Sequence, residues 1–456
     1  MGAPGRRRGL GAEQGGWDVV RELAPEALRR AEPPTGAHVP PFRLRESMNG
    51  MGEAPGKVWF FDLAAAVIDA DRCIRCGACV AACPTDSLGV NADDLPYLVK
   101  MCTGCSLCWD FCPRGGLRYE ATWLEEDPAG EFGPFITGIP AVADPATGEE
   151  KAPELGAVRT GHAARVKPES KYRSPAAQDG GVVTAILLAA LEDGLIDGAL
   201  VAREDPTTPW RGVPHVATTR EELIEAGGSF YNQTLALAAL DLSKVGLGPD
   251  ARLAVVGTPC EIQGIRALQS RSWRWGASRV EAVTLTIALL CTKSFDYRRL
   301  MLDEIAEKRG IALEEVGKVD VIHGRFFAWD KAGEVLIDEP VKAFHGAALK
   351  GCDECADFLG RGADLSVGSV GSEAGYSSVL VRTPLGEAAF ALAAGELEVG
   401  PIERPDALVK LDQLDKRIAS AALARPLEPD APLFIDFAEH LAAYAETDRA
   451  PVWRGR

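Results

Sequence analysis

Two cysteine runs with the same spacing stand between residues 73 and 113. Each run has three cysteines separated by two residues, a fourth after three more residues, and then a proline: Cys73, Cys76, Cys79, Cys83 and Pro84 in the first, Cys102, Cys105, Cys108, Cys112 and Pro113 in the second. This spacing is typical of 4Fe-4S binding, and in paired runs the fourth cysteine binds the cluster of the other run. We therefore predict two 4Fe-4S clusters with crossed ligation.

The crossed arrangement gives each cluster its own ligand set. Set one is Cys73, Cys76, Cys79 and Cys112, and set two is Cys102, Cys105, Cys108 and Cys83. A zinc site more often has two separated CxxC pairs or mixed Cys/His ligands. A disulfide scaffold would be short and rich in cysteine throughout. Both alternatives therefore fit this sequence less well than iron–sulfur clusters.

Four further cysteines lie far from these runs. We name them set three: Cys260, Cys291, Cys352 and Cys355. The first two follow apolar runs that read as strands, and the last two form a CxxC loop, so a third 4Fe-4S cluster is one interpretation. Buried unreactive cysteines and a structural zinc site remain open from the spacing alone. If all twelve cysteines are ligands, the protein works in a reducing compartment, and we expect it to be cytoplasmic.

The composition limits the classes of partner. The 456 residues carry a formal net charge of -17, which argues against nucleic acid as a partner. An apolar fraction of 46% is ordinary for a globular protein, and the longest apolar runs are too short to cross a bilayer. We expect no direct membrane insertion, so any peripheral position at a membrane complex would come through a partner.

The elements that must hold these cysteines suggest two folded parts. Short elements around both runs predict a ferredoxin module of the bacterial two-cluster type, with 58–62 as a strand. Alternating strands and helices after it predict a larger α/β domain, whose ligands would lie beyond the carboxyl ends of the strands. Composition changes give these boundaries: an N-terminal extension at 1–56, the module at 57–124, a linker or insert at 125–165, the α/β domain at 166–425 and a C-terminal tail at 426–456.

Several elements of the larger domain can be placed from local patterns. Gly180 and Gly181 open an apolar helix from Val182 that Gly194 closes, and such a glycine step favours an anion such as a flavin pyrophosphate or is a plain helix start. We predict a second glycine-opened helix from Gly227. We also predict a hairpin from strands at 319–327 and 333–337, and a C-terminal helical region from Gly386.

Six segments of this domain resemble the family of β subunits of coenzyme F420 hydrogenases and dehydrogenases. They are Gln-Asp-Gly-Gly-Val-Val-Thr-Ala at 178–185, Val-Val-Gly-Thr-Pro-Cys-Glu-Ile-Gln-Gly-Ile-Arg at 255–266, Cys-Thr-Lys-Ser-Phe at 291–295, Gly-Cys-Asp-Glu-Cys-Ala-Asp-Phe at 351–358, and the strand pair at 364–372 and 379–383. A ferredoxin module placed before such a domain resembles the electron-input subunit of F420H2 dehydrogenases.

This resemblance implies a flavin-binding domain that holds FAD beside a cluster on set three. It implies electron transfer between reduced coenzyme F420, a 5-deazaflavin, and a ferredoxin or a partner subunit of a dehydrogenase or reductase complex. Only a flavin converts between hydride and single electrons, which agrees with this combination. The cofactor-binding candidates are Gly180, Gly181, Thr184, Ser229, Tyr231, Gly257, Thr258, Pro259 and Lys293.

One segment departs from the family pattern. The family often has Gly-Ser-Lys-Tyr where this chain has Gly228-Ser-Phe-Tyr231, so Phe230 replaces a basic residue. Reduction of a different organic substrate, such as a chlorophyll-type molecule or a sulfur oxyanion, therefore stays open, as does a non-enzymatic electron-relay subunit. No general acid, base or nucleophile is evident, and His162 is the one histidine that we would test.

Overall fold

The computed structural model describes residues 59–117, 124, 138–143, 147–151, 153–240, 245–248, 250–269 and 280–423. The expected N-terminal extension at 1–56, the C-terminal tail at 426–456 and part of the expected insert at 125–165 lie outside these residues. Within this described part of the chain, no helix is long and apolar enough to span a membrane.

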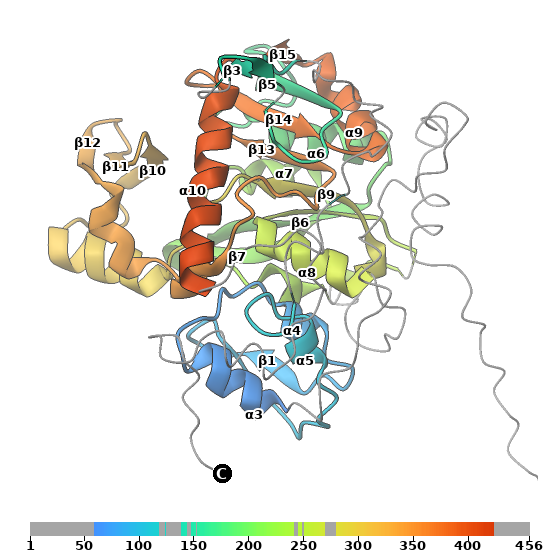
Figure 1. Ribbon diagram of the computed structural model, residues 1–456, viewed down its shortest axis with the longest axis vertical. Helices are drawn as coiled ribbons and strands as arrows, with labels where there is room; N and C mark the ends of the chain where they lie inside the picture. Colours follow the sequence, from blue (N-terminus) through green and yellow to red (C-terminus); the bar gives the residue numbers. More distant parts are fainter. Residues whose placement is uncertain are drawn as a thin grey trace, which may run out of the picture.

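The larger domain is built on an eight-stranded mixed sheet (Figure 1). In spatial order its strands are β15 (Leu397–Gly400), β5 (Thr160–Val166), β14 (Ser377–Val381), β13 (Leu365–Gly368), β9 (Val283–Leu289), β8 (Leu253–Gly257), β6 (Gly198–Asp205) and β7 (Thr208–Ala217). The four neighbours β13, β9, β8 and β6 are parallel, and the other pairs are antiparallel. Their carboxyl ends therefore share one edge of the sheet.

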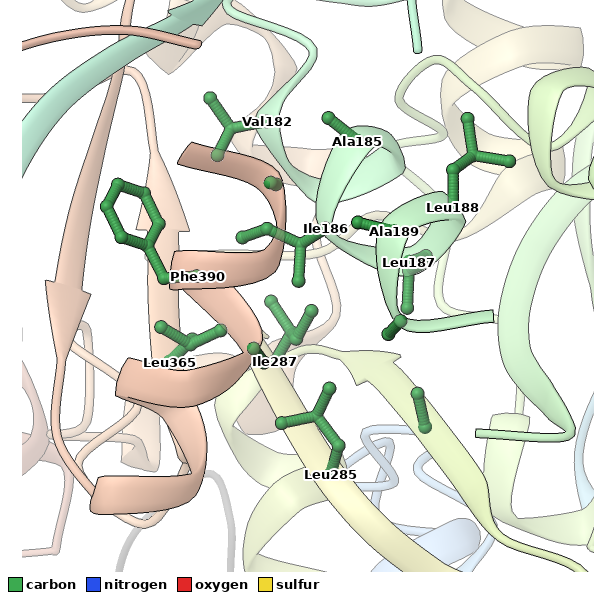
Figure 2. Close-up of a cluster of buried hydrophobic side chains, with 14 of the residues drawn as sticks. Val182, Ala185, Ile186, Leu187, Leu188, Ala189, Leu285, Ile287, Leu365 and Phe390 are labelled. Atoms are coloured by element: carbon green, nitrogen blue, oxygen red, sulfur yellow. The ribbon is translucent and has the colours of Figure 1, made fainter. Parts of the chain in front are cut away.

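Two apolar helices pack together on the sheet, α6 (Val182–Glu192) and α9 (Pro384–Ala394). Figure 2 shows Ile186 of α6 and Phe390 of α9 above Ile287 of β9 and Leu365 of β13. All four side chains are at least nine-tenths buried. Burial of a large apolar side chain contributes about 2 kcal/mol, so this layer fixes the amino-terminal end of α6 against the sheet.

The remaining elements of this domain surround the sheet. The helices are α7 (Arg220–Glu225), α8 (Pro259–Gln269), α10 (Pro405–Leu423), a π-helical segment (Arg298–Glu307) and 3₁₀ turns at Ala236–Ala239, Val280–Ala282, Val341–Ala347 and Lys350–Glu354. A separate antiparallel meander consists of β10 (Val316–Ile322), β11 (Arg325–Asp330) and β12 (Val335–Pro340), and β3 (Val142–Ala143) pairs with β4 (Glu150–Lys151).

The cysteine runs lie in a small module, residues 59–117. Its elements are α3 (Phe60–Leu63), a π-helical turn (Ala64–Ile68), α4 (Ala78–Ala81), the hairpin β1 (Leu88–Val90) and β2 (Pro96–Leu98), and α5 (Leu107–Asp110). Figure 1 shows this module beneath α8 and the β7 end of the sheet. Each one-turn helix, α4 or α5, contains the third cysteine of its run.

The module and the larger domain share one hydrophobic core. Ile74, Ala78 and Phe111 of the module pack in the same cluster as Leu237 and Ile262 of the larger domain. Gly264 of α8 allows this approach, because a Cβ atom there would lie 3.1 Å from the Cβ atom of Ala78. The cysteine module is therefore fixed to the larger domain by its packing.

The structure confirms the α/β pattern and corrects several local predictions. The expected strand at 58–62 is helix α3, because Asp62 caps the backbone amide of Trp59 (2.8 Å) and Phe60 and Leu63 bury one face. The segment after Gly227 is extended and leads to a 3₁₀ turn rather than a helix. The expected hairpin is a three-stranded meander, because the chain turns at His323 and Gly324 with positive φ.

The predicted boundary at residue 166 is also displaced. Strand β5, at the end of the expected insert, pairs with both β14 and β15 and therefore belongs to the large sheet. Its sequence, Thr-Gly-His-Ala-Ala-Arg-Val, has no strong apolar alternation to reveal a strand. Strand β15 lies within the expected C-terminal helical region and was not predicted, because it has only four residues.

Candidate functional site

The four cysteines of set two line one small cavity in the module. Cys83, Cys102, Cys105 and Cys108 surround it together with Phe60 and Leu88. Backbone amides point at two of the sulfur atoms: Ser87 N lies 3.2 Å from Cys83 Sγ, and Gly104 N lies 3.4 Å from Cys102 Sγ. The structure thus brings Cys83 of the first run to three cysteines of the second, as crossed ligation requires.

The cysteines of set one lie together at the side of the module that faces the larger domain. Burial raises the pKa of Cys73 to about 11, with a smaller contribution from the neighbouring Cys112. Burial and the charges of Cys73, Cys76 and Cys112 likewise raise the pKa of Cys79. Cys112 of the second run therefore lies among three cysteines of the first. The two sets are neighbours, since Cys108 also contributes to the raised pKa of Cys79.

The fold assembles set three from three distant segments. Cys260 stands in the first turn of α8, directly after β8, and Cys291 follows β9. Cys352 and Cys355 flank the end of the 3₁₀ turn at Lys350–Glu354. Burial raises the pKa of Cys291 first, and the nearby charges of Cys352 and Cys355 raise it further. The same effect of Cys355 on Cys260 places all four thiols in one partly buried group.

Set three lies next to set one. Burial is the main cause of the raised pKa of Cys260, and Cys76 of set one is the charge that contributes most after it. The three sets therefore follow one another in the order set two, set one and set three.

These groups fit clusters better than single metal ions. Buried thiols resist ionisation, so thiolates at these positions need positive charge nearby, which iron supplies. Each cysteine of a 4Fe-4S cluster binds a different iron, so the sulfur atoms need not meet at one point. Among the residues that the structure describes, no three Cys, His, Asp or Glu side chains converge as they would around a single ion.

A pocket of about 220 Å³ lies at the carboxyl ends of the four parallel strands. Ala202 of β6, Gly257 of β8, Leu289 of β9 and Gly368 of β13 form one wall, and the amino-terminal turn of α6 and the segment at 226–234 form the others. Ligands of open α/β sheets bind in this position, where strand ends and helix amino termini meet. Gly181 caps α6 with a φ of 69°, which is easily adopted by glycine.

Hydrogen bonds connect the pocket wall to set three. Thr258 Oγ1 lies 3.1 Å from Cys260 Sγ and accepts a hydrogen bond from Gln233 Nε2 (3.1 Å). Gln233 Oε1 in turn accepts from Ser294 Oγ (2.9 Å). Thr258, Gln233 and Ser294 all line the pocket. The side chain of Thr258 therefore lies between the pocket and Cys260 of set three.

The structure places five of the nine predicted cofactor-binding residues in the pocket wall: Gly181, Thr184, Ser229, Gly257 and Thr258. The other four lie close by but outside the described lining. Gly180 packs against β5 and β14, and Tyr231 donates a hydrogen bond to Asp320 (2.9 Å). Pro259 is buried at the start of α8, and Lys293 pairs with Asp353.

Several pocket residues were not predicted from the sequence. Asp179 and Glu261 bring carboxyl groups to the lining, and Asn232 and Gln233 bring amides. Burial raises the pKa of Asp179 to about 6 and that of Glu261 to about 7. The described lining contains no lysine or arginine, and Phe230 lines it where the family often has lysine. The sequence signal that could have identified Asp179 and Glu261 is their position next to Gly180 and Cys260.

His162 lies outside this pocket. It is in β5, stacks on Phe390 with ring centroids 4.8 Å apart, and lies 3.0 Å from Thr160 Oγ1 through Nε2. Burial lowers its pKa, so the ring is neutral near neutral pH. These contacts assign it a packing role.

Sequence comparisons cover both parts of the chain. Residues 163–241 and 250–405 match the two profiles described as the N-terminal and C-terminal parts of the coenzyme F420 hydrogenase/dehydrogenase beta subunit. Residues 66–118 match a 4Fe-4S dicluster domain. The beta subunit of the coenzyme F420 hydrogenase of Methanosarcina barkeri is 35% identical over 50% of this chain and 77% of its own length.

Other relatives match a larger share of this chain. One subunit of the F(420)H(2) dehydrogenase of Methanosarcina mazei is 29% identical over 75% of this chain and 88% of its own length. The coenzyme F420-dependent sulfite reductase of Methanocaldococcus jannaschii is 30% identical over 70% of this chain and 46% of its own length. A chain of the F420-reducing [NiFe] hydrogenase complex from Methanosarcina barkeri has a similar structure, with a TM-score of 0.54 and 31% identity over 63% of this chain and 99% of that chain.

Proposed function

The chain belongs to the family of coenzyme F420 hydrogenase/dehydrogenase beta subunits, and from this premise we propose that it is an iron–sulfur flavoprotein oxidoreductase. It exchanges electrons between reduced coenzyme F420 and a ferredoxin or a partner subunit. Its proposed cofactors are FAD in the pocket and 4Fe-4S clusters on sets one, two and three. Relatives named as subunits of F420-linked enzymes support the substrate and the partner.

One observation carries this proposal: the pocket adjoins set three, the last in a row of three neighbouring cysteine sets. Thr258 lines the pocket and contacts Cys260, Cys260 lies near Cys76, and Cys79 lies near Cys108. A bound flavin would supply the exchange between a hydride and single electrons, and bound clusters would carry single electrons. This spatial order of the cysteine sets supports an electron-transfer path from a two-electron site in the pocket to the surface of the module.

The pocket residues fit a flavin in two respects. The amino-terminal turn of α6 presents backbone amides at Val182, Val183 and Thr184, and the helix dipole favours an anion there. Apolar side chains such as Leu187, Val201 and Val256 line the pocket and would exclude water from a ring system. Because the described lining has no lysine or arginine, we propose that backbone amides rather than side-chain cations hold the pyrophosphate.

Phe230 favours a second candidate with the same cofactors. An aromatic ring in place of a cation weakens the binding of an anionic group and favours a flat apolar one. The second candidate is therefore a reductase of another organic substrate, which receives its electrons through the same cysteine sets.

An anaerobic titration tests the proposal. The purified full-length protein is analysed for iron and flavin, then titrated with reduced F420 while flavin and iron–sulfur absorbance are followed, with NADH in parallel. We expect bleaching by reduced F420 and not by NADH. A protein with clusters but without flavin would overturn the oxidoreductase proposal in favour of an electron relay. Flavin and clusters that stay oxidised in reduced F420 would favour the second candidate.

A pair of variants tests the location of the flavin. Thr184→Trp fills the pocket from the first turn of α6, so we expect flavin content to fall while iron content stays unchanged. Thr207→Trp makes the same change at an exposed position of the β6–β7 turn and should keep both cofactors. Retention of flavin in Thr184→Trp would place the flavin elsewhere.

A further inference from the structure

Arg114 lies between set one and set three and is buried from solvent. It follows Cys112 and Pro113, and its side chain is 1% exposed. Its Nε donates a hydrogen bond to the carbonyl oxygen of Gly351 (2.6 Å), the residue before Cys352. One guanidinium group therefore connects the end of the second cysteine run to the CxxC loop of set three.

The charge of Arg114 acts on both sets. Burial by itself would lower the pKa of Arg114, but the nearby negative groups of Cys355, Glu354 and Cys260 outweigh this effect and raise it. Conversely, Arg114 lowers the pKa of Cys355, Cys352 and Cys112, although burial raises all three overall. The negative groups that act most strongly on Arg114 belong to the CxxC loop, so its charge faces set three more than set one.

A neighbouring ion pair holds Arg114 in place. Arg72 donates to both carboxylate oxygens of Glu354 (2.9 and 3.0 Å), to the carbonyl oxygen of Ala66 (2.7 Å) and to that of Arg114 (2.9 Å). Glu354 lies 4.0 Å from Arg114 Nε and pairs more closely with Arg72. Two guanidinium groups thus share one carboxylate, and Arg114 lies on the side of the set-three cysteines.

We propose, on the basis of the function proposed above, that Arg114 sets the reduction potential of the cluster on set three relative to that on set one. A reduced cluster carries one more negative charge than an oxidised one. A buried cation stabilises the reduced form, and the weak screening of the protein interior strengthens the effect. Arg114 therefore raises the potential of the set-three cluster most, which makes it a favourable acceptor beside the pocket.

Redox titrations of the full-length protein, followed by electron paramagnetic resonance, test this role. The signal of the set-three cluster is identified by its loss in Cys352→Ser. Arg114→Gln should lower the potential of this cluster so that electron partition between sets three and one changes about tenfold, or about 59 mV for one electron. Arg114→Lys keeps the charge and should stay near the wild-type value. A purely structural role would affect both variants alike.

A second variant keeps the test decisive if Arg114→Gln loses its clusters. Glu354→Gln removes a negative charge beside set three, so we expect the potential to shift upward, opposite to Arg114→Gln. Arg266→Gln is the matched control, because this buried arginine pairs with Asp364 (3.2 Å) and should change stability but not potentials. No shift in Arg114→Gln or Glu354→Gln, or shifts of the same sign, would overturn the proposal.

The iron content distinguishes a failure of the proposed function from a failure of the role proposed for Arg114. If the wild-type protein contains iron for only two clusters, set three holds no cluster, and this part of the proposed function fails. Iron for three clusters with unchanged potentials in the Arg114 and Glu354 variants would overturn the role of Arg114 alone.

Discussion

The two cysteine runs repeat one backbone conformation in two unlike environments. Arg75 and Gly104 occupy equivalent positions and have φ of 55° and 65°, and Gly77 and Ser106 are likewise equivalent, with φ of 83° and 67°. Gly77 faces the larger domain, where an added Cβ atom would lie 2.6 Å from Ala238 N. The second run faces outward, and Cys105 is exposed.

This difference teaches that the spacing of the cysteines fixes the conformation of the loop, whereas its neighbours decide which residue type it needs. Arg75 reaches Asp296 of the larger domain in a buried ion pair, and at the equivalent position Gly104 packs against the ring of Trp59. Position 106 adopts the positive φ with a serine, while position 77 requires glycine because the backbone of the larger domain lies against it.

The largest expected effect comes from exchanging the fourth cysteines. Cys83→Ser should lose the cluster of the second run, and Cys112→Ser should lose the cluster of the first, because the ligand sets are crossed. Each variant should lose about one cluster of iron, and Cys112→Ser should also weaken the contact with the larger domain. Iron analysis and electron paramagnetic resonance measure both effects. Loss of the first run's own cluster in Cys83→Ser would contradict crossed ligation.

The next effect concerns the inner loop. Gly77→Ala adds a Cβ atom against Ala238 N and Leu235 O and strains a positive φ, so we expect the free energy of unfolding to fall by about 2–5 kcal/mol. Anaerobic urea denaturation, followed by cluster absorbance and tryptophan fluorescence, measures it. Ser106→Gly at the equivalent outer position is the control and should change stability by about 1 kcal/mol or less. Equal losses in both variants would remove the distinction between the two loops.

Loss of the inner ion pair should have a smaller effect. Burial alone would raise the pKa of Asp296, but the amide of Arg299 and the guanidinium of Arg75 hold it below its ordinary value. Arg75→Gln leaves a buried carboxylate without this partner, so stability should fall by about 3 kcal/mol near neutral pH. Urea denaturation measures the loss, and Lys100→Gln on the exposed side is the control.

The pH dependence of this variant gives a further check. In the wild type, the depressed pKa of Asp296 contributes stability that is present above the ordinary value of 3.8 and is lost as the pH falls through the folded-state pKa. This group should therefore change nothing between about pH 7 and pH 5. In Arg75→Gln the pKa of Asp296 rises, so lowering the pH should restore part of the stability. A variant without this recovery would show that Arg75 acts by packing alone.

The smallest effect is expected for Gly104→Ala. The new Cβ atom would lie 2.8 Å from the ring of Trp59, and the positive φ adds strain. A ring can shift where a backbone cannot, so we expect a loss of about 1–2 kcal/mol, less than for Gly77→Ala. Thermal unfolding under anaerobic conditions ranks the two variants, and a larger loss in Gly104→Ala would reverse the comparison.

Much of the site could be predicted from local sequence because its chemistry depends on spacing. Cysteines at fixed intervals, with small residues between them, indicated the cluster loops before any fold was known. Val182–Glu192 carries its own helix signals, an opening glycine pair and a closing Gly194, and the structure has this helix. The buried apolar runs of β8 and β9 were also recognisable, since central parallel strands are apolar throughout.

The sequence by itself determined the loop conformation of the cysteine runs, helix α6 and strands β8 and β9, because these depend on neighbours along the chain. Only the tertiary structure decided that Cys260, Cys291 and the CxxC loop meet, that β5 joins the sheet, and that Asp179 and Phe230 line the pocket. It also decided that Arg114 lies beside set three. Contacts between distant segments depend on how whole elements pack, and that information is not contained in any local pattern.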